Sequence, residues 1–319
     1  MPLPTDEKIL KLSNDLIQAF DTLFGLHPGF RPAHAKGIML TGKFTPTRDA
    51  ASLSRAPHFN RSSTPVTVRF SNSTGVPVIP DSDPNADPRG LALRFNLAEH
   101  VHTDIVAHSI DAFPTRTGEE FLEFLRAVAA STDQSKSHPW PVEEFLGSHP
   151  AALAFVQAPK PAPSSFARET YFGVTAMRFI SSSGEAHYGR YRIIPEGGND
   201  HLDPEALKAK EPDYLFKEIE ERVVKSPIRF KVAVQLAKEG DVVDDATVHW
   251  PEDRRIVDLG DVDLTALVSD NGQEQQRIIF DPIPRVDGIE PSADPLLELR
   301  AAVYLISGRR RRSAPPTKA

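Results

Sequence analysis

The stretch Gly90-Leu-Ala-Leu-Arg-Phe-Asn96 alternates apolar and polar residues at roughly every second position, which is typical of a half-buried β-strand. Runs with the same character surround it and recur in the second half of the chain, at Gly37 to Thr45, Pro65 to Ser71, Asp104 to His108, Tyr171 to Ile180, His187 to Ile194, Phe230 to Ala237 and Arg255 to Leu264. Connections such as Ser181-Ser-Ser-Gly-Glu185 resemble hairpin turns. The pattern favours a closed antiparallel β-barrel over a doubly wound parallel sheet.

Helical patterns flank this predicted barrel, so the fold class is α+β. Residues 6–24 form an apolar stripe after the plausible cap Thr5 or Asp6, and later helices are expected at Gly118 to Ala130, Val142 to Phe155, Asp203 to Val224 and Pro295 to Arg312. We expect a single domain over residues 1–319, with an N-terminal helix in 1–26, a barrel with inserted helices in 27–280, a loop and final helix in 281–312, and a flexible tail in 313–319.

Composition excludes several classes of function. The 319 residues contain no transmembrane run and no signal-peptide core, so we expect a cytoplasmic protein without a membrane partner. The formal net charge is -7 and the only dense basic run is Arg309 to Arg312, which makes nucleic acid a poor partner. The absence of Cys excludes disulfides, thiolate catalysis and iron–sulfur clusters. Any redox chemistry therefore needs a cofactor.

Two segments near opposite ends of the chain resemble the two sides of a haem pocket. In Arg31-Pro-Ala-His34-Ala-Lys-Gly37, a histidine lies among small residues, where it can act as an acid/base over an open metal face. In Arg300-Ala-Ala-Val-Tyr304, a tyrosine follows an arginine by one helical turn, so that both side chains share a helix face. A phenol binds ferric iron as phenolate, and the adjacent guanidinium favours that charged form.

Further motifs extend the resemblance over most of the chain. They are Pro65-Val-Thr-Val-Arg-Phe-Ser71, Asp87-Pro-Arg-Gly-Leu-Ala-Leu-Arg-Phe95, Val248-His-Trp-Pro251, Phe280-Asp-Pro282 and Gly288-Ile-Glu-Pro-Ser292. Together with the His34 segment they resemble the catalase family, in family order, from about residue 27 to residue 312. This collinear set is far more specific than any one motif.

The resemblance implies a haem b cofactor and a role for each matching residue. His34 corresponds to the distal acid/base of the family, and Ser71 to the hydroxyl that holds its ring. Tyr304 corresponds to the proximal ligand of the haem iron, with Arg300 beside it. The remaining matches are the propionate-binding residues Arg31, Arg69 and Arg311 and the porphyrin-stacking ring of Phe121.

Two departures from the family pattern bear on the reaction. His108 replaces the distal-pocket Asn that helps to orient the second peroxide of catalase turnover. It acts either as a second proton-transfer group or bonds the backbone, and the sequence leaves both alternatives open. Ala33 stands where typical catalases carry a bulkier Val, which implies wider access to the iron and admits organic hydroperoxides.

The length of the chain resembles that of small, catalase-related peroxidases. By this resemblance we expect it to be without the N-terminal arm, the wrapping segment and the C-terminal helical domain of typical catalases. Barrel faces that those segments cover must be polar or find a partner, so we expect a homodimer.

The resulting hypothesis is a haem-dependent peroxidase. It reduces hydrogen peroxide or organic hydroperoxides with a small-molecule external electron donor and has weak or no catalase activity. Two alternatives keep the same fold. One is an isomerase that converts a fatty-acid hydroperoxide into an allene oxide, and the other is a non-enzymatic haem-binding protein.

Overall fold

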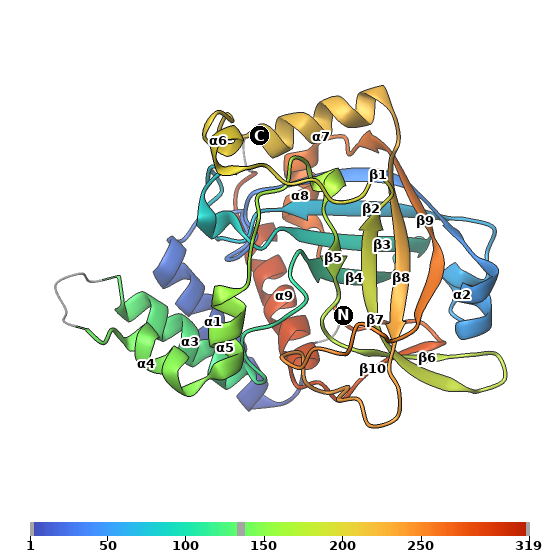
Figure 1. Ribbon diagram of the computed structural model, residues 1–319, viewed down its shortest axis with the longest axis horizontal. Coiled ribbons are helices and arrows are strands. Elements are labelled where there is room, and N and C mark those ends of the chain that lie inside the picture. The colour runs from blue at the N-terminus through green and yellow to red at the C-terminus, as the bar shows by residue number, and fades with distance from the viewer. Residues whose placement is uncertain (1–2, 133–137, 317–319) are drawn as a thin grey trace.

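An antiparallel sheet that closes on itself forms the centre of the molecule in the computed structural model, which describes residues 3–132 and 138–316 (Figure 1). Its strands pair in the ring order β1–β2–β3–β4–β5–β7–β8–β9, and β9 returns to β1. Outside this ring, β6 pairs with β7, and β10 pairs with the other edge of β6. The bounds are β1 Gly37–Pro46, β2 Thr64–Ser71, β3 Gly90–Ala98, β4 Val101–His108, β5 Tyr171–Phe172, β6 Met177–Ile180, β7 Ala186–Pro195, β8 Ile228–Leu236, β9 Ile256–Leu267 and β10 Ile289–Pro291. The predicted closed antiparallel barrel is confirmed.

The strand alternation separates the barrel core from a polar outer face. Successive side chains of a strand point to opposite sides of a sheet. One set of β2 and β3 side chains is buried in the main apolar cluster, namely Val66, Val68, Phe70, Leu91, Leu93 and Phe95. The other set, which includes Arg69, Ser71 and Arg94, therefore lies on the outer face.

The strand register places several candidate residues in one row. Gly37 pairs with Ser71, Ser71 with Gly90, and Gly90 with His108. Paired residues of an antiparallel sheet share a face. Ser71 and His108 therefore lie on the same outer face, with only a glycine between them.

Helices cover this outer face. α9 (Leu296–Arg312) lies between the barrel and the pair α1 (Glu7–Phe24) and α3 (Gly118–Ala130) (Figure 1). An apolar cluster formed by Leu16, Leu122, Leu125 and Leu299 joins these three helices. The remaining helices are α2 Arg48–Leu53, η1 Pro57–Phe59, η2 Pro84–Ala86, α4 Pro141–Ser148, α5 Pro150–Gln157, η3 Phe166–Arg168, α6 Pro204–Lys208, α7 Tyr214–Lys225 and α8 Asn271–Arg277.

The structure corrects two of the predicted elements. The helix expected from Val142 to Phe155 is divided into α4 and α5, because Pro150 cannot continue a preceding helix. The strand expected from Tyr171 to Ile180 is divided into β5 and β6, since residues 173–176 leave the sheet. Of the predicted tail 313–319, residues 317–319 lie outside the described part of the chain.

No helix in the described residues is both long enough and apolar enough to cross a membrane.

Candidate functional site

His34 lies immediately before β1 in a left-handed backbone conformation, with φ at 57°. Its N–H donates to the carbonyl of Ser73 at 2.7 Å, and its ring Nδ1 lies 3.1 Å from Ser71 Oγ. Gly90 leaves room for this arrangement, because a Cβ there would lie 2.8 Å from Nδ1. The predicted pairing of Ser71 with the ring of His34 is therefore present in the structure.

The two histidines of this face are neutral at pH 7. Burial, followed by the charge of Arg69, lowers the pKa of His34 to about 3. Burial, followed by the charge of Arg300, lowers the pKa of His108 to about 4. A neutral imidazole has one nitrogen free to accept a proton, which a general base requires.

His108 shows the backbone bond that was one of its two predicted alternatives. The N–H of Ile110 donates to Nδ1 of His108 at 3.4 Å. In the neutral ring, Nε2 then carries the proton and is a hydrogen-bond donor. His108 thus contacts the backbone through one nitrogen and keeps a donor at the other.

Three arginines converge near the C-terminal end of α8. Arg31 and Arg311 both donate to the carbonyl of Ile278, at 3.1 and 2.7 Å. Arg31 also donates to the carbonyl of Gln275 at 3.0 Å, and Arg69 Nε donates to the Gln275 side chain at 2.8 Å. Residues that were predicted from distant segments therefore form one basic cluster, hereafter the arginine triad.

No carboxylate neutralises the arginine triad among the residues that the structure describes. Burial and the charge of Arg311 lower the pKa of Arg69 to about 9, and burial and the charge of Arg31 lower that of Arg311 to about 8. The Nε of Arg311 is buried and has no hydrogen-bond partner in the described part of the chain. Buried like charges normally require a counter-ion. The triad thus fits an anionic ligand that carries more than one carboxylate. A haem is such a ligand, because it has two propionate groups.

Tyr304 and Arg300 lie one turn apart on α9, as predicted. Nε and Nη2 of Arg300 lie 3.4 and 3.3 Å from the Tyr304 hydroxyl. The charge of Tyr304 acts to raise the pKa of Arg31. The charge of Arg300 acts to lower the pKa of both His34 and His108. Tyr304 is therefore near the arginine triad, and Arg300 is near both histidines.

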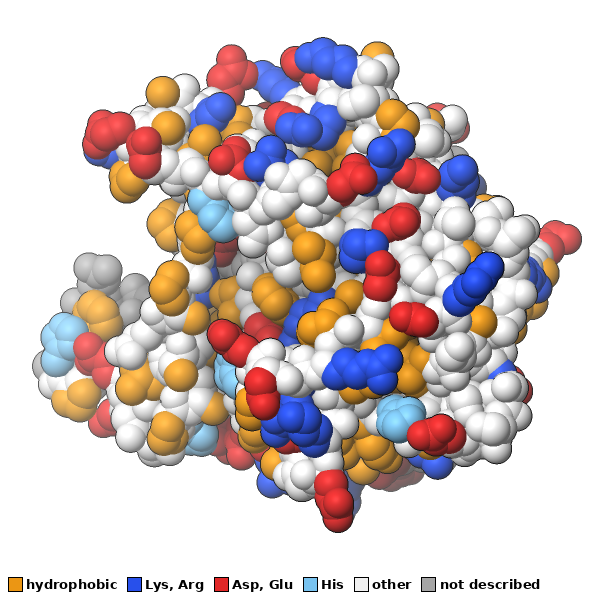
Figure 2. Space-filling view, turned by 45° about the vertical axis from the view of Figure 1, so that its right-hand side comes forward, with side chains coloured by type: hydrophobic (Ala, Val, Ile, Leu, Met, Phe, Trp, Pro, Cys, Tyr) orange, Lys and Arg blue, Asp and Glu red, His pale blue; other side chains and the backbone are white. Residues whose placement is uncertain are grey.

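Several of these side chains border open space. Four of them are only partly buried, namely Arg31, His34, His108 and Tyr304. Burial is nevertheless the main cause of the lowered pKa of the two histidines. Figure 2 shows a recess in the surface of the molecule, with hydrophobic and basic side chains in its depth.

The other two candidates lie beside this region. Phe121 packs against the cluster of α1, α3 and α9 to which Val303, the neighbour of Tyr304, also belongs. Its ring centroid lies 5.2 Å from that of Phe113 and 6.1 Å from that of Phe20. Ala33 keeps part of its surface exposed next to His34.

Gln275 is a site residue that sequence reasoning missed. Its side-chain oxygen accepts from Arg69, and its nitrogen donates to the carbonyl of Gly37 at 2.8 Å and to Asn271 Oδ1 at 2.7 Å. It therefore ties α8 to β1 and fixes one guanidinium of the triad. The glutamine-rich run after Asn271 could have indicated the helix that carries Gln275. The preceding Asn271-Gly272, however, is typical of a turn.

Comparison with known proteins agrees with this geometry. The catalase family model matches residues 29–316. A catalase-related peroxidase of Synechococcus elongatus is 33% identical over 93% of this chain and 88% of its own length. A second protein of that name, from Mycolicibacterium paratuberculosis, is 34% identical over 91% of this chain and 92% of its own length.

Solved structures show the same fold. Catalase A from Saccharomyces cerevisiae superposes with a TM-score of 0.79 at 22% identity, and a fungal catalase with 0.78 at 23% identity. The present chain covers 65% and 59% of those two chains. Since the family model spans most of the sequence and both peroxidases match over almost all of it, this chain belongs to the catalase family, in its small catalase-related form.

Proposed function

We propose that this protein is a haem-dependent peroxidase that reduces hydrogen peroxide or organic hydroperoxides with electrons from an external small-molecule donor. The observation that carries the proposal is the arginine triad without a carboxylate, close to a neutral His34 and to the Arg300–Tyr304 pair. The two catalase-related peroxidases support the same reaction class by their names and their near-complete coverage.

The cofactor that fits these residues is haem b. The Tyr304 oxygen would ligate the iron as phenolate, stabilised by Arg300, and the arginine triad would bind the propionates. Phe121 would supply an aromatic surface to the porphyrin. When bound, the haem supplies the redox-active iron at which the O–O bond of the peroxide is reduced.

His34 would move the proton. Its Nδ1 faces Ser71 Oγ, so the tautomer with hydrogen on Nδ1 donates to the serine and leaves Nε2 free as the base. Nε2 takes the proton from the peroxide oxygen and later returns it to the leaving oxygen. Overall, ROOH, two electrons and two protons give ROH and water. Ser71 therefore orients the base.

His108 and Ala33 would shift the balance from catalase to peroxidase activity. Where the family carries an Asn amide, His108 has a bulkier ring with a single donor at Nε2. This difference disfavours the ordered binding of a second peroxide. The small side chain of Ala33 leaves access for larger hydroperoxides and for reductants.

The stoichiometry of the haem-loaded protein tests this function. We expect two equivalents of a phenolic one-electron donor to be oxidised for each hydrogen peroxide consumed, with little oxygen released. Oxygen release at one molecule for every two peroxides, whether or not a donor is present, would instead identify a catalase.

The two alternatives give different results. An isomerase would convert a fatty-acid hydroperoxide without added reductant, because isomerisation consumes no electrons. A non-enzymatic haem-binding protein would consume peroxide no faster than free haem does.

A further inference from the structure

His58 occupies an unusual position inside the barrel. It lies in η1 and its side chain is fully buried, and neither ring nitrogen has a hydrogen-bond partner within residues 3–132 and 138–316. Its ring packs against those of Phe59 and Phe95, with centroid distances of 4.1 and 4.4 Å. Burial lowers the pKa of His58 to about 3, so the ring is neutral and has one donor and one acceptor. Both are unused by the protein.

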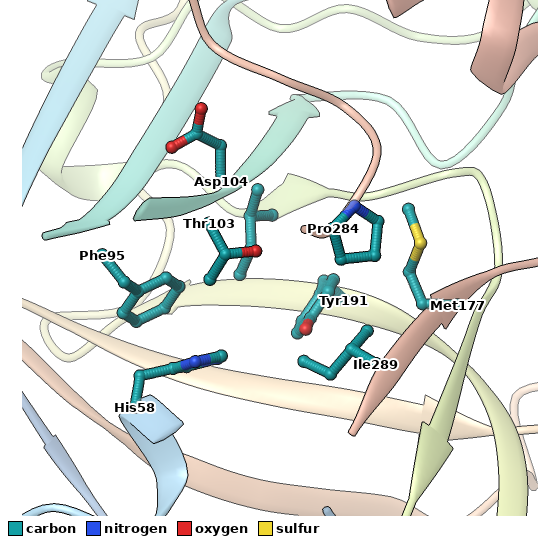
Figure 3. Close-up of a pocket in the computed structure, with 9 residues that line it drawn as sticks. His58, Phe95, Thr103, Asp104, Met177, Tyr191, Pro284 and Ile289 are labelled. Atoms are coloured by element: carbon teal, nitrogen blue, oxygen red, sulfur yellow. The ribbon is translucent and has the colours of Figure 1, made fainter. Parts of the chain in front are cut away.

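Two hydroxyl groups face the same space. His58, Thr103 and Tyr191 line one small pocket, whose other walls are mostly apolar. Figure 3 shows the imidazole edge of His58 and the two hydroxyls directed into it from η1, β4 and β7. Neither hydroxyl has a hydrogen-bond partner among the described residues. Polar groups of three side chains thus converge unpaired on one small space.

Such convergence requires an occupant. Buried polar groups in native proteins are nearly always hydrogen-bonded, and an unpaired one is costly in free energy. If these positions formed an ordinary apolar core, leucine, valine and phenylalanine could fill them without leaving any polar atom unpaired. A small molecule that both donates and accepts hydrogen bonds can pair with both hydroxyls and with one nitrogen of His58, which removes much of this cost.

The space lies next to a second one that Arg300 of α9 lines. β4 pairs with β5 only through His108 and Phe172, so most of β4 has no strand on that side. A second pocket lies there, lined by Arg300, and shares the four lining residues Asp104, Ile105, Met177 and Tyr191 with the first. The two spaces therefore adjoin each other where β4 has no neighbouring strand.

We propose that the barrel contains a second binding site, in which His58, Thr103 and Tyr191 hold one small neutral hydroxylic molecule, water or hydrogen peroxide. Where β4 has no neighbouring strand, this molecule exchanges with the Arg300 side of the proposed haem pocket. The site itself is independent of haem binding and of the proposed peroxidase reaction, because its three polar side chains lie outside that machinery.

A crystal structure of the haem-loaded protein tests occupancy directly. We expect electron density for an isolated oxygen within hydrogen-bond distance of His58 and of both hydroxyls. Absence of that density would overturn the proposal. Crystals of His34→Ala, soaked in hydrogen peroxide, identify the occupant, since elongated density indicates peroxide and unchanged density indicates water.

Isosteric variants measure the contribution of the occupant in solution. Tyr191→Phe and Thr103→Val each remove only the hydroxyl function, and with an occupied site we expect each to lower Tm by about 2 °C or more. The double variant should lose less than the sum, since both groups bind the same molecule. Tyr214→Phe is the matched control, because the Tyr214 hydroxyl donates to the carbonyl of Pro163 at 2.8 Å and must lower Tm in any case. An unchanged or raised Tm in both single variants, beside a lowered Tm in the control, would show a dry cavity and contradict the proposal.

Discussion

Arg69 donates from Nη2 to the backbone carbonyl of His34 at 2.8 Å. The same guanidinium donates to Gln275 on α8 and belongs to the arginine triad. It therefore contributes both to the left-handed turn that presents the histidine ring and to the proposed anion site. Binding of the cofactor carboxylates and placement of the acid/base are thereby linked through one side chain.

Replacement of His34 by alanine should lower the rate of peroxide consumption by about 10²- to 10⁴-fold, the range usual for loss of a general acid/base. Haem content should remain, because the arginine triad and Tyr304 are untouched. His187→Ala is the matched control, since His187 is half-buried and pairs with Glu185 away from the site. Equal rates for the two variants, measured by steady-state donor oxidation, would remove His34 from the mechanism.

Arg311 and Arg309 form a pair for testing the anion site. Both belong to the same basic run at the end of α9, but Arg311 is 3% exposed whereas Arg309 is exposed. Arg311→Ala should weaken haem binding about tenfold to a hundredfold, as expected for loss of a charge-assisted hydrogen bond. Arg309→Ala should leave it unchanged. The measurement is the rate and extent of haem transfer to a competing haem-binding protein, and equal transfer from both variants would rule out Arg311 as a ligand.

Gly90 should tolerate no side chain. A Cβ at this position would lie 2.6 Å from Ser71 Oγ and 2.8 Å from His34 Nδ1. Gly90→Ala should displace the ring of His34 and lower peroxidase activity by about a hundredfold, because small displacements of a reacting group have large effects on rate. Gly147→Ala, in α4 with open space around the added methyl, is the control. Full activity of Gly90→Ala would show that the Ser71 contact does not position the ring.

His58 should make the protein sensitive to acid. Its folded pKa of about 3 lies below the ordinary value of 6.5, so the unfolded chain binds the proton more tightly. The stability contributed by the neutral ring is thus complete above pH 6.5 and is lost as the pH falls toward 3. Between pH 7 and pH 4.5 the wild type should lose about 3 kcal/mol relative to His58→Gln.

The check is denaturant unfolding of both proteins at the two pH values. Contributions of His34 and His108, and the opposite contribution of Asp87, whose pKa burial raises to about 6, are common to both proteins and cancel. If the free energy of unfolding changed equally with pH in the wild type and in His58→Gln, the pKa of His58 would not be lowered in the folded protein.

The sequence predicted the barrel strands because most of them have one apolar and one polar face, which a period of two reveals. Arg311 was singled out from its neighbours by the resemblance to the catalase family, and the structure shows the helical spacing that goes with it. Arg300, Tyr304 and Arg311 recur at helical spacing, and Ser307 on the same face accepts from Arg311 at 2.9 Å. Periodicity therefore placed Arg300 and Tyr304 on one helix face, and the resemblance to the catalase family supplied the roles of all three residues.

Other features could not be predicted because they depend on tertiary contacts. Gln275 acquires its role only when α8 folds against β1, and no local pattern encodes that contact. His58 is one histidine among apolar neighbours, and its unpaired nitrogens become evident only when β4 and β7 close around it. The division of the strand at residues 173–176, which leaves most of β4 without a neighbouring strand on that side, likewise has no clear signal beyond Gly173.

The ferric spectrum of the haem-loaded protein, compared with that of Tyr304→Phe, tests the central claim most directly. Phenylalanine keeps the ring and removes the oxygen that lies beside Arg300. We expect a high-spin spectrum with phenolate character in the wild type, loss of that character with weakened haem retention in Tyr304→Phe, and no change in the control Tyr214→Phe. Equal haem retention and an unchanged spectrum in Tyr304→Phe would contradict the assignment of Tyr304 as the proximal ligand.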